Sequence, residues 1–291
     1  MQLGYFYILG AGLAWGMLGI FIKGLYAYNF EPLQIVSARA TLAAGILALV
    51  LAFVKPELLK VKLRDLWMFI GTGVFSIVMS NYASFSSLKE VGISVAIVLL
   101  YTSPVFVTLM AAVIFKEPLT KRKLVALLLA LIGCALVSGL GQSDSVGRVN
   151  MFGLTMGLLS AFGYALYSIF GVYAVRAGYH PITITVYTFI TAAVCSWLLT
   201  NPIAIVEKIV SIKAFLFIAA IAVLCSIAPY FLYAKGLETV EASKASILAC
   251  SEPAMAIVFG VTLFHEPFTG MMAVGVCSIL AAILLLNDRK K

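Results

Sequence analysis

The sequence predicts an all-α integral membrane protein in which ten transmembrane helices form two inverted five-helix repeats. Three observations predict this fold class: the composition, the number of long apolar runs, and a short phrase that occurs twice. The chain of 291 residues is 63% hydrophobic and only 11% charged, with a mean hydropathy of +1.09. A soluble domain carries about 25% charged residues, so most of this surface must face lipid or other parts of the chain.

Long apolar runs mark the membrane-spanning helices, because backbone groups in hydrocarbon must hydrogen-bond within their own segment. The runs do not alternate in polarity as transmembrane strands do. Breakers such as Glu31-Pro32 and His180-Pro181 separate most of them, whereas the gaps near Lys89-Glu90 and within Lys235–Lys244 are marked by charge alone. The ten expected helices cover residues 3–22, 33–54, 65–85, 92–115, 121–140, 151–174, 182–200, 213–233, 242–264 and 269–287.

The first of these runs, residues 3–22, follows Met1-Gln2 directly. It has neither the basic segment nor the small-residue cleavage site of a signal peptide. We therefore expect it to remain in the protein as a spanning helix.

Basic residues determine the expected orientation in the membrane. The net charge is +8, but all Lys and Arg residues except Arg39 lie at the ends of the predicted helices or between them, and they form no nucleic-acid-binding run. Most of them fall on the side that ten crossings would share with both termini. Basic residues favour the cytoplasmic side, so both termini are expected in the cytoplasm, in an inner or plasma membrane.

Several classes of protein are excluded by what the sequence lacks. The five cysteines each lie alone in an apolar segment, and His180 and His265 are too few for a haem or copper centre. Neither a phosphate-binding G-x-x-x-x-G-K-[ST] loop nor an H-E-x-x-H metal motif occurs. We expect no cofactor, no metal, no catalytic residue and no nucleic-acid partner.

The repeated phrase is F-x-E-P-x-T, at Phe115–Thr120 and again at Phe264–Thr269. A shift of 149 positions aligns residues 88–120 with 237–269, and ten of the thirty-three aligned pairs are identical. Five crossings per half is an odd number, so the second half must enter the membrane upside down. Such halves enclose a cavity and are associated with alternating access. We expect the two repeats at residues 1–142 and 150–291.

The phrase itself is expected to be structural. Its proline ends the preceding helix, and Thr120 or Thr269 then caps the next one. Glu117 and Glu266 would each lie near the positive end of that same following helix. The alternative is a role of these two glutamates in gating.

Further motifs resemble the EamA-type transporters of the drug/metabolite transporter superfamily. They are Ala14-Trp15-Gly16, Ser37-Ala38-Arg39, Leu99–Pro104, Phe115–Thr120, Ser251-Glu252-Pro253 and Phe264–Thr269. The resemblance covers nearly the whole chain and implies a ten-helix inner-membrane carrier, with a central cavity lined mainly by helices 1, 3, 4, 6, 8 and 9. Members of this family move amino acids, purines, other metabolites or quaternary amines, often as exporters.

Two ionisable side chains inside predicted helices are candidate substrate ligands, because a charge at membrane depth is costly. Arg39 lies about 10 Å into helix 2 and Glu252 about 15 Å into helix 9, so the two can pair with each other, with a substrate or with a proton. Alternatively, Arg39 is a structural partner of backbone carbonyls or a snorkelling charge. The corresponding alternative for Glu252 is a protonated, hydrogen-bonded carboxyl beside Pro253.

Polar aromatic residues and prolines complete the predicted site. Pro104 and Pro253 are expected to interrupt two cavity-lining helices, as in other carriers, or only to help the helices pack. Aromatic faces hold apolar or cationic groups, although tyrosines near helix ends also serve as interfacial anchors. The remaining predicted substrate ligands are Trp15, Asn81, Tyr82, Tyr101, Tyr164 and Tyr230.

The predicted function is secondary transport of a small metabolite by alternating access, most simply export of an amino acid or a related compound, with possible proton coupling through Glu252. One alternative is import of a quaternary amine such as choline. Another is a lipid flippase component or a membrane-embedded lipid enzyme. The sequence has no His, Asp and Glu cluster for such an enzyme. Gly12-x-x-x-Gly16 and Gly153-x-x-x-Gly157 are expected to pack helices internally, so no oligomeric state is predicted.

Overall fold

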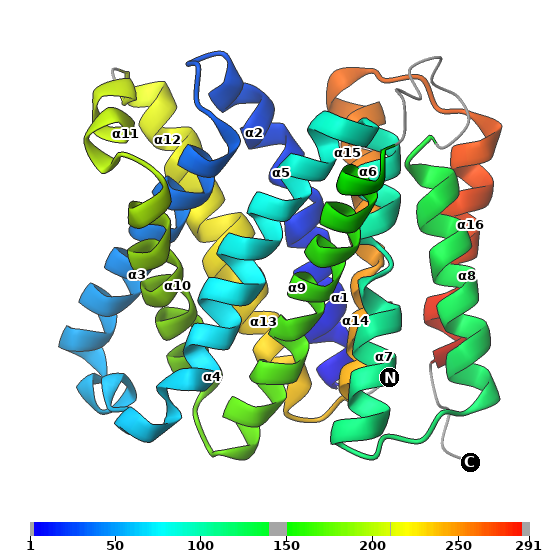
Figure 1. The fold of residues 1–291 in the computed structure, drawn as a ribbon, viewed down its shortest axis with the longest axis horizontal. Helices are drawn as coiled ribbons and strands as arrows, with labels where there is room; N and C mark the ends of the chain where they lie inside the picture. The colour runs from blue at the N-terminus through cyan, green and yellow to red at the C-terminus, as the bar shows by residue number, and fades with distance from the viewer. Residues whose placement is uncertain (1–2, 140–149, 210, 287–291) are drawn as a thin grey trace.

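The computed structural model describes residues 3–139, 150–209 and 211–286, and this part of the chain is helical without any strand. The helices run side by side between two opposite edges of the molecule (Figure 1). We call these the lower edge, which holds the α7–α8 and α13–α14 turns, and the upper edge, which holds the α5–α6 and α15–α16 turns. Residues 143–149, which separate the two predicted repeats, and the basic residues Arg289–Lys291 lie outside the described residues.

The predicted first half contains eleven helical elements. They are α1 (Leu3–Gly16), α2 (Leu18–Tyr26), α3 (Pro32–Val54), η1 (Pro56–Leu59), η2 (Leu63–Asp65), α4 (Leu66–Ile70), η3 (Gly71–Met79), α5 (Ser80–Val91), α6 (Ile93–Leu100), α7 (Ser103–Ile114) and, as the last of the half, α8 (Lys121–Val137). The predicted second half contains α9 (Met151–Arg176), α10 (Pro181–Leu199), α11 (Pro202–Lys208), α12 (Ile212–Ala220), η4 (Ile221–Ile227), α13 (Ala228–Leu237), α14 (Ala242–Ala249), α15 (Ser251–Phe264) and α16 (Gly270–Leu286).

The second half has nine elements, two fewer than the first, because α9 is continuous where the first half has α1 and α2, and α11 stands where the first half has η1 and η2.

Eight helical runs are long and apolar enough to cross a membrane, so the protein is a multi-pass helical membrane protein. They are Leu3–Tyr26, Pro32–Val54, Leu63–Val91, Ile93–Ile114, Met151–Arg176, Pro181–Leu199, Ile212–Leu237 and Ala242–Phe264. The other two predicted spans correspond to α8 and α16, which have 17 residues each in the described part of the chain. A run of that length lies at the lower limit for crossing a bilayer, about 17 residues.

Helices α8 and α16 pack closely against each other at one end of the bundle (Figure 1). A Cβ atom on Gly133 would lie 2.8 Å from the Gly275 carbonyl oxygen, and one on Gly275 would lie 2.9 Å from the Gly133 carbonyl oxygen. Only glycine at both positions allows the two backbones to approach this closely. The Ser278 hydroxyl donates to the Leu129 carbonyl oxygen across the same contact, at 2.8 Å.

The structure contains three features that apolar periodicity did not predict. Helix α11 follows Asn201-Pro202, which we interpreted only as a breaker; the Asn201 side chain caps this helix, and Pro202 is its first residue. Two π-helical segments, η3 and η4, occupy equivalent places in the two halves. The helices that follow them also extend to Val91 and Leu237, because charged residues are tolerated in the last turn of a helix.

The first and last described helices end at the same edge of the molecule. The Tyr5 hydroxyl near the start of α1 donates to the carbonyl oxygen of Leu286, the last residue of α16, at 3.1 Å. Figure 1 shows both ends at the lower edge.

The two copies of F-x-E-P-x-T form the same turn at opposite edges, α7–α8 at the lower edge and α15–α16 at the upper edge (Figure 1). Lys116 and His265 are both left-handed, with φ of 57° and 53°. In each turn the glutamate N–H donates to the carbonyl oxygen six residues earlier, at 3.2 Å, so both turns close the preceding helix with the same hydrogen bond. The predicted caps are confirmed, because Thr120 and Thr269 each accept a backbone N–H at 3.3 Å.

Each of the two glutamates also makes contacts with a helix other than the one that follows it. The Glu117 carboxylate lies 3.7 Å from the Nζ of Lys123, in the first turn of the following helix α8. Glu117 accepts hydrogen bonds from the N-terminus of α14, in the other half of the chain. Glu266 pairs with Lys23 of α2, with 2.6 Å between Nζ and Oε1. The left-handed residue turns each chain outward before the glutamate, so the side chain reaches a neighbouring helix.

Candidate functional site

A cavity of about 110 Å³ lies between helices of the two predicted halves, and we call it the central cavity. Helices α1, α3, α5, α9, α13 and α15 contribute to its wall, together with η3. Six of the eight predicted substrate ligands line it: Trp15, Arg39, Asn81, Tyr164, Tyr230 and Glu252. Residues that are up to 237 positions apart in the sequence therefore meet at one site.

Arg39 faces the central cavity from the second turn of α3. Its side chain is only 6% exposed, and its Nε has no hydrogen-bond partner. Among the described residues, its guanidinium also has no ion pair with Glu252 or with any other carboxylate within 4 Å. A buried donor without a partner costs about 1–3 kcal/mol. The guanidinium is therefore available to a ligand in the cavity.

Glu252 enters the cavity from the first turn of α15. The Tyr164 hydroxyl donates to its Oε2 at 3.3 Å, and the Tyr101 side chain lies beside the same carboxylate. The start of a helix carries a partial positive charge that favours an anion. Glu252 occupies this position because α14 ends at Ala249 and a new helix begins at Ser251.

The same interruption occurs in both halves. Helix α6 ends before Tyr101 and α7 begins at Ser103, whereas α14 ends before Cys250 and α15 begins at Ser251. A shift of 149 positions superimposes Tyr101 on Cys250. Pro104 and Pro253 lie in the first turn of the second segment of each pair, where the missing N–H of proline costs no helical hydrogen bond. Both cavity-lining helices are thus divided close to Glu252.

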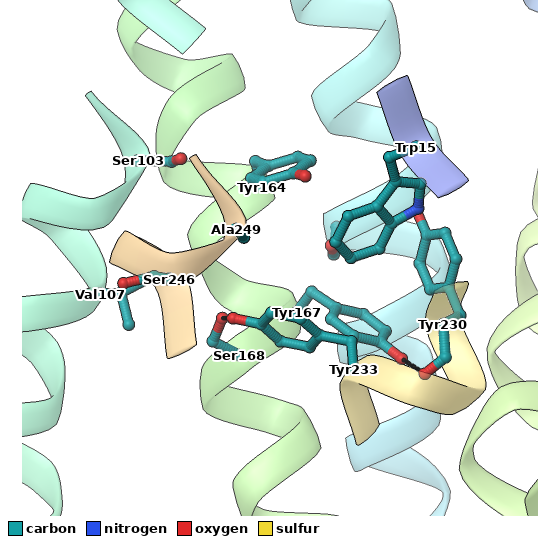
Figure 2. A pocket seen from close by; sticks show the side chains of 11 residues that line it. Trp15, Ser103, Val107, Tyr164, Tyr167, Ser168, Tyr230, Tyr233, Ser246 and Ala249 are labelled. Carbon is teal, nitrogen blue, oxygen red and sulfur yellow. Dashed lines mark hydrogen bonds between the residues drawn. The ribbon is translucent and has the colours of Figure 1, made fainter. Parts of the chain in front are cut away.

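A cluster of four aromatic rings separates the central cavity from the lower edge, and Figure 2 shows them converging from α1, α9 and α13. Trp15 meets Tyr230 edge to face with ring centroids 5.3 Å apart, and Tyr167 meets Tyr230 in the same way at 4.9 Å. The Tyr233 hydroxyl is hydrogen-bonded to Ser168 at 2.8 Å. All four rings are buried, and only a pocket of about 20 Å³ remains among them.

Two predicted ligands lie outside this lining. Tyr82 follows Asn81 on α5, and one residue along a helix turns the side chain by about 100°. Asn81 faces the cavity, so Tyr82 faces away and is 51% exposed. Tyr101 does not line the central cavity but supports Glu252 from the break after α6.

Serine hydroxyls line the central cavity at places that our sequence reasoning missed. Ser76, Ser80 and Ser84 recur every fourth residue along η3 and α5, and Ser160 faces them from α9. The Ser80 hydroxyl donates to the Ser160 carbonyl oxygen at 2.8 Å. Their spacing of four was the available signal, because it places hydroxyls on one face of a helix. Within the three described ranges, no three His, Cys, Asp or Glu residues are grouped to hold a metal ion.

Comparison with known proteins identifies the family. The EamA-like transporter family model matches the chain twice, over residues 2–139 and 151–288. The chain belongs to the EamA-like transporter family. This EamA-like chain is therefore a membrane transporter.

Relatives of similar length support the assignment. An uncharacterized transporter of Archaeoglobus fulgidus is 27% identical over 289 residues, which is 95% of either chain. The uncharacterized transporter YcbK of Bacillus subtilis is 25% identical and covers 99% of this chain and 93% of its own. The threonine/homoserine exporter RhtA of Salmonella typhimurium is 28% identical over 83% of this chain and 77% of its own. A solved crystal structure at 16% identity matches 98% of this chain with a TM-score of 0.81, so the fold is shared.

Proposed function

We propose that this EamA-like chain is a secondary transporter that exports a small zwitterionic metabolite of the amino-acid class by alternating access. One observation carries the proposal: Arg39 and Glu252 both face the central cavity without pairing with each other. Arginine binds a carboxylate through two parallel hydrogen bonds, and a carboxylate binds an ammonium group. A ligand with both charges satisfies both side chains at once, whereas an uncharged ligand leaves both unpaired.

The cavity wall fits the rest of such a ligand. Serine hydroxyls from η3, α5 and α9 offer hydrogen bonds to a polar side chain, and the rings of Trp15 and Tyr230 offer an apolar face. The similarity to a protein named threonine/homoserine exporter supports both the substrate class and the direction. Glu252 also serves in this proposal as the group that exchanges substrate for a proton.

The proposed mechanism requires two inverted halves, residues 1–142 and 150–291. In this topology α8 and α16 complete five crossings per half, which gives ten transmembrane helices in total. Equivalent turns at opposite edges and equivalent helix breaks at the cavity support it. The excess of basic residues on the side of the termini supports a cytoplasmic location of both ends, in an inner or plasma membrane.

A thermal-shift comparison of three matched compounds tests the substrate class. Threonine carries both charges, 1-amino-2-propanol lacks its carboxylate, and 3-hydroxybutyrate lacks its ammonium group. A ligand that binds only the folded protein raises the melting temperature by mass action. We expect stabilisation by threonine or another amino acid at concentrations where neither single-charge analogue acts. Equal stabilisation by the amine and the amino acid would refute a zwitterionic substrate.

A quaternary amine is the second candidate substrate, because Trp15, Tyr164 and Tyr230 surround a carboxylate in the same cavity. Aromatic faces bind such cations well. In that case choline would stabilise the protein and threonine would not. The unpaired guanidinium of Arg39 disfavours this ligand, because it would repel the bound cation.

A further inference from the structure

The lower edge is closed by a contact between the two halves. The Glu117 carboxylate accepts the backbone N–H groups of Ala242, at 2.8 Å, and Ser243, at 3.1 Å, and also the Ser243 hydroxyl. Lys123, which is 1% exposed, lies 3.7 Å from this carboxylate and 2.6 Å from that of Glu241. The turn between α7 and α8 therefore clamps the positive end of α14. We call these contacts of Glu117 with α14 the lower latch.

Helix α14 runs inward from this latch and is closely packed. All of its residues except Lys244 are buried. It packs against α7 of the first half and against α1 and α9. The aromatic cluster lies beside it, and Ser246 and Ala249 of α14 line the same small pocket as the rings (Figure 2). The path from the central cavity to the lower edge is therefore shut.

The upper edge carries the same residues without the same contacts. The shift of 149 positions relates Glu117 to Glu266 and Ser243 to Ser94, so both the acceptor and the hydroxyl donor of the latch are repeated. Yet the Glu266 side chain is 50% exposed and pairs with Lys23. Helix α6 has no side-chain cap at its start, and Ala96 is its one buried residue.

The residues on either side of the central cavity are also more closely packed on the lower side than on the upper side. On the lower side Tyr230 and Tyr233 fill the space with aromatic rings. Their equivalents on the upper side are Asn81 and Ser84, which are smaller and line the open cavity. The structure thus has a closed lower side and a looser upper side, built from two halves that share one pattern.

We propose that the two F-x-E-P-x-T turns are alternating latches, with Glu117 clamping α14 when the lower side is closed and Glu266 clamping α6 when the upper side is closed. In the second state Glu266 accepts the backbone N–H groups of Ile93 and Ser94 and the Ser94 hydroxyl, as Glu117 now does at α14. The lower latch then opens. This inference rests on the proposed function, because alternating access requires that the two sides never close or open together.

Two further features are consistent with a change between the two latched states. Gly92, just before α6, has a φ of 81°, and glycine can change this angle freely as the helix start is captured. Lys23 holds Glu266 in its present place, and its Nζ also lies 4.3 Å from the centre of the Phe264 ring. Arg176 covers Phe115 in the equivalent way at 4.5 Å, but Glu117 is bound to α14 instead. Lys23 is therefore the group that keeps the upper latch released.

Cysteine accessibility in substrate-free protein tests the latches directly. Two reporters are introduced separately into a variant that lacks the five native cysteines: Ser84→Cys on the upper side and Ser246→Cys on the lower side of the cavity. Their reaction rates with a small hydrophilic maleimide report the opening of each side. The rates are compared among Glu266→Gln, Lys23→Met and Glu117→Gln. Glu238→Gln serves as the matched control, because it breaks only the partly exposed pair with Lys235.

The expected changes have opposite signs. Lys23→Met frees Glu266 to close the upper side, so Ser84→Cys reacts more slowly and Ser246→Cys faster, each by about tenfold for the gain of a charge-assisted bond. Glu117→Gln acts in the same direction. Glu266→Gln acts in the opposite direction, because it removes the upper latch, and Glu238→Gln leaves both rates unchanged.

A surface ion pair with no other role would give a different result. Lys23→Met and Glu266→Gln would then have the same effect on both reporters, or none, and either outcome overturns the latch. The measurement contains no substrate, so it stands apart from the ligand comparison that tests the proposed function. A misfolded variant would be recognised because both reporter cysteines would react faster by the same factor. The directions of the rate changes in the remaining variants would still test the latches.

Discussion

Replacing Arg39 with methionine separates a ligand-binding role from a structural one, because the two roles predict opposite effects on the empty protein. Methionine matches the length of the arginine stem and removes the charge. The buried Nε has no partner, so its removal should stabilise the empty protein by about 1–3 kcal/mol. If Arg39 instead donated hydrogen bonds to backbone carbonyls, its removal would leave those carbonyls unpaired, and the melting temperature would fall.

The same substitution should weaken zwitterion binding selectively. A carboxylate bound to Arg39 makes two charge-assisted hydrogen bonds, and after their desolvation cost the loss is about 3 kcal/mol, or roughly a hundredfold in Kd. The matched amine 1-amino-2-propanol does not use Arg39, so its weak binding should not fall. Titration calorimetry or thermal shift measures both ligands against Arg39→Met.

Arg64→Met is the matched control, since Arg64 has a side chain that is 77% exposed and does not line the central cavity. It should leave both affinities unchanged. Two results would show that Arg39 does not recognise the carboxylate. One is an equal loss of affinity for the amine and the amino acid in the Arg39→Met variant. The other is that this variant binds threonine as tightly as the unchanged protein. A lower melting temperature of the empty protein would contradict the unpaired state of the guanidinium.

Three further predictions concern packing and charge. Gly73→Ala should destabilise the protein by about 1–3 kcal/mol, because a Cβ there would lie 2.3 Å from the Thr188 carbonyl oxygen of α10; an unchanged melting temperature would contradict the close contact. Lys123→Met should lower stability by roughly 1–3 kcal/mol, since Glu241 loses its partner at 2.6 Å, and addition of Glu241→Gln should recover part of the loss. Tyr233→Phe should lower the free energy of unfolding by about 1 kcal/mol, because the Tyr233 hydroxyl is hydrogen-bonded to a serine of α9. Ligand affinity should stay within twofold, and a large loss of affinity would instead place this ring in the binding site.

The sequence predicted the helices well where an apolar run is bounded by helix-breaking residues. Proline and glycine positions set the ends of α3, α7 and α15 to within a residue or two, because a proline cannot continue a helix. The π-helical segments and α11 could not be foreseen, since the apolar pattern of a π-segment resembles that of an α-helix and α11 is a short helix in a polar connection. Tyr82 lies outside the cavity lining for a related reason: neighbouring residues on a helix share a depth but not a face.

The sequence by itself determined the class, the duplication and the family, because these follow from properties that are summed along the chain: the apolar length of each run, the recurrence of a phrase after 149 positions, and motifs in a fixed order. It also identified Arg39 and Glu252, since a charge in an apolar run is costly wherever the run packs. Only the tertiary structure decided that these two side chains share a cavity and remain unpaired, and that Glu117 is bound while Glu266 is released. Those facts depend on which helices meet and how closely, and in a chain with two similar halves the same residues can satisfy either arrangement.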